Sequence, residues 1–157
     1  TARGAYGLSK LVGEAMIRHG HPRWIIARYH NVYGPGQRRG SVIPDLLERA
    51  DVEEPFRIAN ATQTRAFCYV DDAVEATLRL AQCPEAIGQV VNVGTEEEIT
   101  IGELAMKIRR DAELLPGPWY RRCPDTTKLR TLTGWSPAVT LDSGLAKTRE
   151  AHEVHDL

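Results

Sequence analysis

The chain has 157 residues, 42% of them hydrophobic and 26% charged, which suits one globular domain. Its 20 Lys and Arg against 21 Asp and Glu leave a net charge of −1. This balance lacks the basic field on which nucleic-acid and membrane-surface binding depend, so we expect neither partner.

The first predicted elements are a helix and a buried strand. Apolar residues recur with helical spacing from Leu8 to Met16, and Gly20 is a favoured helix end. The run Trp24–Ala27, continued through Asn31, is apolar without alternation, which indicates a strand of a parallel sheet covered on both faces.

The middle of the chain repeats this alternation of helices and strands. Ser41 is placed to cap a helix, with Pro44 tolerated in its first turn. Short strands are expected around 56–58 and 65–70. Asp72 and Glu75 have capping-box spacing and predict the start of the next helix. A buried strand follows at 89–93.

The last third begins with a second capping box, formed by Thr100 and Glu103. The stretch 116–118 reads as a loop, a short helix runs from Asp125 to about Thr133 and ends at Gly134, and a last helix follows Thr140. Helices that alternate with buried strands predict the α/β class.

The three cysteines are Cys68, Cys83 and Cys123. Their odd number and long spacings indicate reduced thiols of a cytoplasmic protein rather than a disulfide framework. No histidine or cysteine pattern has metal-ligand spacing, so we expect no metal site.

Tyr6 and Lys10 lie four residues apart and so share a helix face. An ammonium held near a phenol favours the phenolate, which makes this pair suitable for moving a proton to or from a sugar hydroxyl. On spacing alone, an ordinary surface contact between the two side chains is the more common explanation.

Two further stretches could bind phosphate. Residues 34–40 are rich in glycine and lie between a strand and a helix, but their spacing fits a plain turn better than a phosphate loop. Arg65, Arg121 and Arg122, with Asp125 nearby, offer paired donors for a diphosphate and a carboxylate for ribose. Taken singly, each such residue is more often a solvated charge.

Taken together, the motifs resemble the extended short-chain dehydrogenase/reductase superfamily, in its nucleotide-sugar epimerase/dehydratase branch. The matching segments occur in the family's order and cover nearly the whole chain. They are Tyr6–Lys10, 27–37, 64–72, 91–94, 121–128 and 134–145.

The resemblance implies a role for each matching residue. Tyr6 would be the catalytic acid/base, and Lys10 would hold the nicotinamide ribose and tune Tyr6. The implied cofactor-binding residues are Tyr6, Lys10, Tyr29, His30 and Val32. The implied substrate-binding residues are Asn31, Val42, Ile43, Phe56 (through its backbone), Arg65, Arg122 and Asp125.

The resemblance also implies an incomplete fold. A Gly-rich turn after the family's first strand would carry the cofactor pyrophosphate, and this sequence has none before Tyr6. We therefore expect the C-terminal part of a Rossmann-type parallel sheet plus a small mixed α/β substrate-binding region. Residues 1–35 would end the dinucleotide-binding domain. Residues 36–157 would bind substrate, interleaved with a remaining Rossmann strand and helix at about 65–95.

Such a piece should retain NAD or NADP poorly and expose an apolar edge. The function implied is that of an NAD(P)-dependent nucleotide-sugar epimerase, possible as a homodimer. A 4,6-dehydratase or decarboxylase of the same family is the alternative, and a non-catalytic nucleotide-binding module is the alternative from another class. A simple carbonyl reductase fits less well, because small ketones do not need the long C-terminal region.

Overall fold

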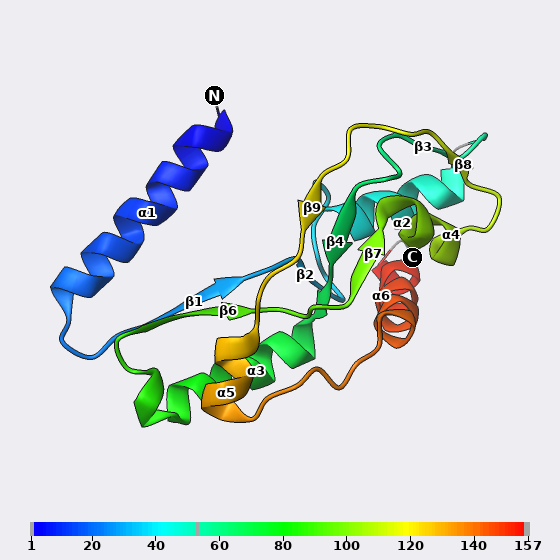
Figure 1. The fold of residues 1–157 in the computed structure, drawn as a ribbon. Helices are drawn as coiled ribbons and strands as arrows, with labels where there is room; N and C mark the ends of the chain where they lie inside the picture. The colour runs from blue at the N-terminus through cyan, green and yellow to red at the C-terminus, as the bar shows by residue number, and fades with distance from the viewer. Residues whose placement is uncertain (1, 53, 156–157) are drawn as a thin grey trace.

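The computed structural model describes residues 2–52 and 54–155 (Figure 1). Helices and strands alternate along the chain, as the sequence predicts for the α/β class. The helices are α1 Ala2–Gly20, α2 Val42–Val52, α3 Val70–Gln82, the short 3₁₀ helix η1 Pro84–Ala86, α4 Ile101–Ile108, α5 Thr127–Thr133 and α6 Leu141–His155. The strands are β1 Ile25–Tyr29, β2 Val32–Tyr33, β3 Arg57–Ile58, β4 Thr64–Ala66, β5 Cys68–Tyr69, β6 Gln89–Val93, β7 Glu98–Thr100, β8 Glu113–Leu114 and β9 Arg121–Arg122.

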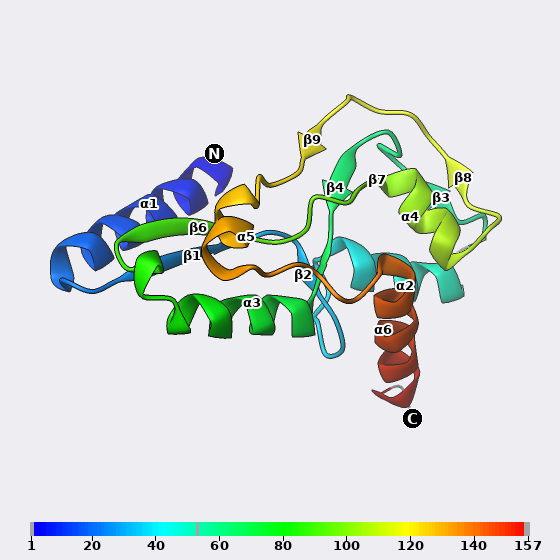
Figure 2. The same ribbon diagram turned by 60° about the horizontal axis from the view of Figure 1, so that its bottom comes forward.

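The parallel pair β1–β6 forms the centre of one half of the molecule. It runs in register from Ile25 opposite Gln89 to Tyr29 opposite Val93. Helix α3 lies along one side of this pair and α1 along the other (Figure 2). The apolar run therefore forms the predicted parallel strand, with one core cluster built from β6, α3, α5 and the buried Trp135.

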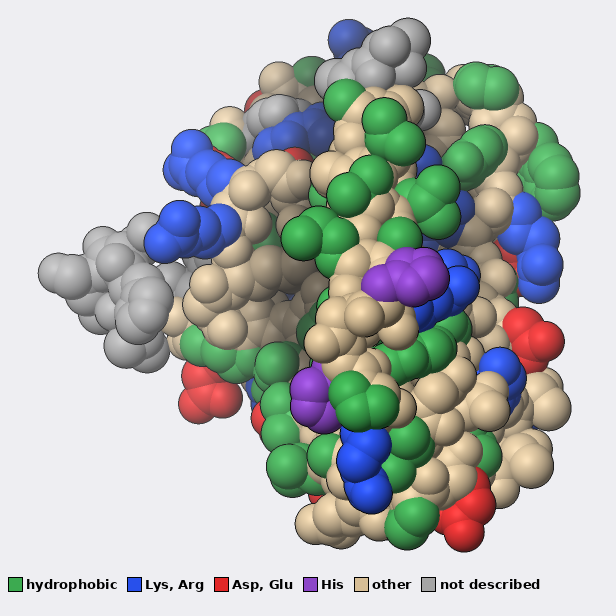
Figure 3. Space-filling model, turned by 90° about the vertical axis from the view of Figure 1, so that its left-hand side faces the viewer, with side chains coloured by type: hydrophobic (Ala, Val, Ile, Leu, Met, Phe, Trp, Pro, Cys, Tyr) green, Lys and Arg blue, Asp and Glu red, His purple; other side chains and the backbone are tan. Residues whose placement is uncertain are grey.

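Helix α1 covers its side of the strands only loosely. On β1, Ile26 is buried but Arg28 and Tyr29 are exposed, so the expected cover on both faces is not complete at its carboxyl end. The apolar face of α1 is itself exposed: Leu8, Leu11, Val12 and Met16 are each at least half accessible. Figure 3 shows hydrophobic side chains gathered along this face. We expected an apolar edge on the sheet; the exposed apolar surface found here is the face of this helix, and the sheet edge stays a prediction.

The second core cluster joins elements from distant parts of the sequence. Helices α2, α4 and α6 contribute apolar side chains to it, around the buried Ile58 of β3 and Phe56 just before that strand. The strands there form small sheets: β3 pairs with β8, β2 with β5, and β4 lies between β7 and β9. The division at residue 35 stays a prediction.

Most of the sequence signals for helix ends hold, among them Gly20 at the end of α1, and one fails. The Thr100–Glu103 capping box is present, and Gly134 ends α5 with a φ of 64°. The capping box predicted at Asp72 is wrong, because α3 begins at Val70 directly after β5. Asp72 is instead buried and accepts hydrogen bonds from the backbone N–H groups of Ala138 and Val139 at 2.9 and 3.0 Å.

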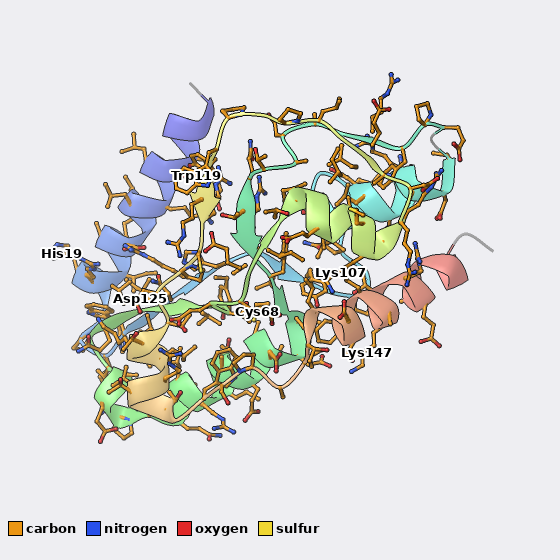
Figure 4. All side chains as sticks on the ribbon, turned by 45° about the vertical axis from the view of Figure 1, so that its right-hand side comes forward. His19, Cys68, Lys107, Trp119, Asp125 and Lys147 are labelled. Atoms are coloured by element: carbon orange, nitrogen blue, oxygen red, sulfur yellow. The ribbon has the colours of Figure 1, made fainter. Side chains whose placement is uncertain are left out.

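Residues 34–37 form the expected turn, in which the Gln37 N–H donates to the Gly34 carbonyl at 3.3 Å and Gly36 has a φ of 74°. All three cysteines are free thiols. Cys68 lies at the centre of the fold (Figure 4), where burial raises the pKa of its thiol to about 12. None of the described helices is long and apolar enough to cross a membrane.

Candidate active site

A groove of about 710 Å³ lies between α1 and β1. Tyr6, Lys10 and Glu14 line it from the helix, and Tyr29 and His30 line it from the carboxyl end of the strand. The structure thus brings together four of the five residues predicted for catalysis and cofactor binding. The fifth, Val32, packs against the β6–α3 core cluster and does not line this groove.

The predicted pair on α1 is in contact. The Lys10 ammonium lies over the Tyr6 ring, 5.3 Å from its centroid. Two-thirds of the Tyr6 side chain is accessible, and its backbone carbonyl accepts a hydrogen bond from the Ser9 hydroxyl at 2.8 Å. The phenol and the ammonium are therefore presented together to the groove.

A charged pair that the sequence analysis missed fastens α1 to β1. The Arg28 guanidinium donates two hydrogen bonds of 2.7 Å, one to each carboxylate oxygen of Glu14. These bonds lower the pKa of Glu14 and raise that of Arg28. Glu14 follows Lys10 by one helical turn, a spacing that places it on the face of Tyr6 and could have identified it.

The two residues at the carboxyl end of β1 are each held by a side chain of another element. The Tyr29 hydroxyl and the Thr77 hydroxyl on α3 share a hydrogen bond of 2.8 Å. The Nε2 atom of His30 lies 3.3 Å from the side-chain oxygen of Asn92 on β6. Asn92 was not singled out from the sequence, because nothing in its local pattern shows which strand lies beside it.

Asn31, predicted to contact substrate, ties the end of β1 to the strands that follow. Its side-chain amide donates to the Ala66 carbonyl at 2.8 Å, and its own carbonyl accepts from the Cys68 N–H at 3.2 Å. Its φ of 42° lies in the left-handed region, which asparagine tolerates better than most residues.

The predicted diphosphate-binding arginines come from adjacent strands. In the parallel pair β4–β9, Arg65 lies opposite Arg122, and aligned residues of paired strands project from the same face. The Arg122 guanidinium also stacks 4.8 Å from the centre of the Tyr120 ring. Asp125 follows β9; its carboxylate accepts from the Thr127 N–H at 2.9 Å, which lowers the pKa of Asp125.

The remaining predicted residues belong to the second core cluster. Ile43 and Phe56 are each 1% exposed, and Val42 packs against the same cluster. The buried side chains of Ile43 and Phe56 are therefore not available to contact a nucleotide base. The predicted contact would have to be made by the backbone at these positions. Within the described ranges, no three His, Cys, Asp or Glu side chains are grouped to hold a metal ion.

A Tyr–Lys pair on a helix that stands beside the carboxyl end of a parallel strand defines the class of short-chain dehydrogenases/reductases. The comparisons with known proteins agree. Residues 1–94 match the model of the NAD dependent epimerase/dehydratase family. The chain belongs to that family, whose members are NAD-dependent enzymes.

Individual relatives cover nearly all of this chain. It is 31% identical to the UDP-N-acetyl-alpha-D-glucosaminuronate decarboxylase of Bacillus cytotoxicus, over 93% of this chain and 52% of the relative. It is 32% identical to GDP-mannose 3,5-epimerase 1 of Oryza sativa subsp. indica, over 92% of this chain and 42% of the relative. The chain thus spans about half the length of these curated relatives.

Among solved structures, the UDP-glucuronic acid 4-epimerase of Bacillus cereus, crystallised with UDP-glucuronic acid and NAD, superposes with a TM-score of 0.83. It is 29% identical, and the match covers 96% of this chain and 52% of that one. This agreement supports the predicted Rossmann-type architecture.

Proposed function

We propose that this chain provides the tyrosine-bearing part of an NAD(P)-dependent nucleotide-sugar epimerase. The observation that carries the proposal is the placement of Tyr6 and Lys10 in one groove with Tyr29 and His30. A nucleotide-binding module that did no chemistry would need neither the phenol nor the ammonium beside it.

The groove suits a nicotinamide and its ribose. The Lys10 ammonium can donate to ribose hydroxyls, and the Tyr29 and His30 rings offer flat surfaces and hydrogen bonds at the strand end. When bound, NAD(P) would accept a hydride from the sugar carbon and return it. The family is NAD-dependent, and NADP is the alternative cofactor.

The chain's own residues would move the proton. Tyr6, as phenolate, would take the proton of the sugar hydroxyl while the carbon that bears this hydroxyl is oxidised. The Lys10 ammonium over the ring would stabilise the negative phenolate oxygen. After the keto-sugar turns over, Tyr6 would return the proton as the hydride comes back on the opposite face.

The nucleotide part of the substrate would bind away from the groove. Arg65 and Arg122, side by side on β4 and β9, would contact the diphosphate, and Asp125 would accept from a ribose hydroxyl. Binding energy from this remote portion would hold the reacting carbon in place. Asn31, Val42, Ile43 and Phe56 complete the proposed substrate side.

A decarboxylase or dehydratase of the same family is the second candidate. The similarity to a UDP-N-acetyl-alpha-D-glucosaminuronate decarboxylase favours it to nearly the same degree as the epimerases. Both candidates use the same first oxidation. A homodimer and a cytoplasmic location remain part of the proposal.

The test uses the protein expressed from its complete coding sequence, with NAD or NADP and either UDP-glucose or UDP-glucuronic acid. We expect a stereoisomer of the supplied sugar nucleotide by chromatography; release of CO₂ from UDP-glucuronic acid identifies the decarboxylase instead. Tyr6→Phe should lower turnover about a hundredfold or more.

Tyr33→Phe is the matched control, because it removes a phenol that is buried in the core, where its hydroxyl donates to the Leu141 carbonyl at 3.3 Å. Its turnover should stay close to that of the parent. Nucleotide binding without conversion of either sugar nucleotide would favour the binding module. Full turnover by Tyr6→Phe would refute the role of Tyr6.

A further inference from the structure

A polar link joins the cofactor side of the site to its substrate side. His30, at the end of β1, contacts the side-chain oxygen of Asn92 on the neighbouring strand β6. The side-chain nitrogen of Asn92 donates to the backbone carbonyl of Asp125 at 3.0 Å. Asp125 begins the turn that leads into α5 and is labelled in Figure 4. One amide thus connects a groove residue with a residue of the proposed nucleotide site.

The chemistry of this link fixes its direction. A backbone carbonyl can only accept, so the atom of Asn92 that faces Asp125 must be the amide nitrogen. The atom that faces His30 is then the amide oxygen, which can only accept as well. His30 must therefore donate from Nε2, and a neutral imidazole protonated at Nε2 carries its lone pair on Nδ1.

The backbone of His30 is held against the end of β6 and the glycine that follows it. The His30 N–H donates to the Val93 carbonyl at 2.9 Å. Gly94 lies so close that a Cβ at this position would be 3.1 Å from the His30 Cβ and 3.2 Å from a ring carbon of Pro124. His30 and the turn at 124–125 therefore approach each other across a glycine that no other residue replaces without displacement.

A second contact holds the same turn. One carboxylate oxygen of Glu96 accepts from the Thr126 N–H at 2.7 Å and from the Thr126 hydroxyl at 2.8 Å. Strand β6 is thus joined to the turn before α5 at Asn92, and the loop after β6 is joined to the same turn at Glu96. The turn that carries Asp125 cannot shift without disturbing the partner of His30.

We propose that Asn92 is a positioning residue. Its amide holds His30 as the Nε2–H tautomer and presents Nδ1 as an acceptor for a hydrogen-bond donor bound in the groove, of the class of a carboxamide N–H. Through Asp125, the same amide couples this acceptor to the nucleotide side of the site. The inference rests on the proposed function for the nature of the ligand, but the tautomer itself does not.

The tautomer is tested first, on this chain, by long-range ¹H–¹⁵N NMR with ¹⁵N-labelled histidine at a pH where imidazole is neutral. The chain has five histidines, so His30 is assigned by the signal lost in His30→Gln. We expect Nε2 to be protonated and its proton to exchange slowly. In Asn92→Ala this proton should exchange rapidly and the two tautomers should mix.

Gln89→Ala is the matched control, because Gln89 is another amide on β6 that contacts Lys128 instead, at 3.3 Å. It should leave the His30 signals unchanged. Should Asn92→Ala fold poorly, Asn92→Asp keeps the acceptor for His30 and removes the donor to Asp125; it should preserve Nε2–H and shift the amide signals of 125–127. Protonation at Nδ1 in the parent, or a slowly exchanging Nε2–H in Asn92→Ala, would overturn the proposal.

The coupling is tested in the protein from the complete coding sequence. Asn92→Ala should raise the KM for both NAD(P) and the sugar nucleotide, each about tenfold, while kcat falls less. His30→Gln should raise the KM for NAD(P) alone. An Asn92→Ala variant that lowers only kcat contradicts the coupling. If no sugar nucleotide is converted, the proposed function fails while the NMR result still decides the role of Asn92.

Discussion

Arg28 on β1 donates two hydrogen bonds of equal length to the carboxylate of Glu14 on α1, 14 residues earlier in the sequence. Paired donors on a guanidinium match the two oxygens of a carboxylate, so this contact fixes the orientation of the helix as well as its distance from the strand. Because Lys10 and Tyr6 precede Glu14 by one and two turns, the same contact sets which way the proposed catalytic pair faces.

We first predict that Glu14→Gln loosens α1. Glutamine has nearly the size of glutamate but no charge, so the variant loses the ionic part of the contact with Arg28. The backbone amides of α1 should then exchange with solvent roughly two- to fivefold faster. Hydrogen exchange read residue by residue measures this. The control is Glu75→Gln, which weakens an ion pair with Arg79 inside α3 and should leave α1 unaffected.

The second prediction concerns the loss of the Glu14–Arg28 contact at acidic pH. Bonds from Arg28 lower the pKa of Glu14 in the folded chain below its usual value of 4.5. The contact is therefore fully favourable above the ordinary glutamate pKa and is lost as the pH falls through the lowered one. NMR shifts of α1 amides should follow this loss on titration from neutral to strongly acidic pH. The same transition in Glu14→Gln would show that another group is responsible.

The third prediction concerns the buried carboxylate of Asp72. It caps two backbone N–H groups of the segment before α6, and removing it leaves both without their partner. We expect Asp72→Ala to lower the free energy of unfolding by about 1–3 kcal/mol, measured by urea denaturation. Asp71→Ala, in the same helical turn but exposed, should change it little.

Gly94 supports a fourth prediction. A methyl group there would press on His30 and Pro124, so Gly94→Ala should lower the free energy of unfolding by about 1–3 kcal/mol. Gly13→Ala provides the contrast: its Cβ would meet open space on α1, and alanine favours helix by roughly 1 kcal/mol. The midpoint temperature of thermal unfolding should therefore fall for Gly94→Ala and rise for Gly13→Ala.

Local sequence signals located most elements of this fold. Helical spacing from Leu8 to Met16, the Thr100–Glu103 box and Gly134 each depend on residues within one or two turns, and each was read correctly. Asp72 has the same local pattern as Thr100, yet its partners are Ala138 and Val139, 66 and 67 residues away. No local pattern distinguishes the two cases.

The candidate site divides in the same way. Tyr6 and Lys10 could be paired from sequence because a helix fixes the geometry of residues four apart. The sequence therefore determined the α/β class, the family motifs and the pairing of the two residues proposed for catalysis. Only the tertiary structure decided that Glu14 meets Arg28. It also decided that Asn92 joins His30 to Asp125. The burial of the Ile43 and Phe56 side chains in the core likewise became visible only in the fold. Those contacts depend on which strands become neighbours, and that choice is made by packing of the whole chain rather than by the residues beside each one.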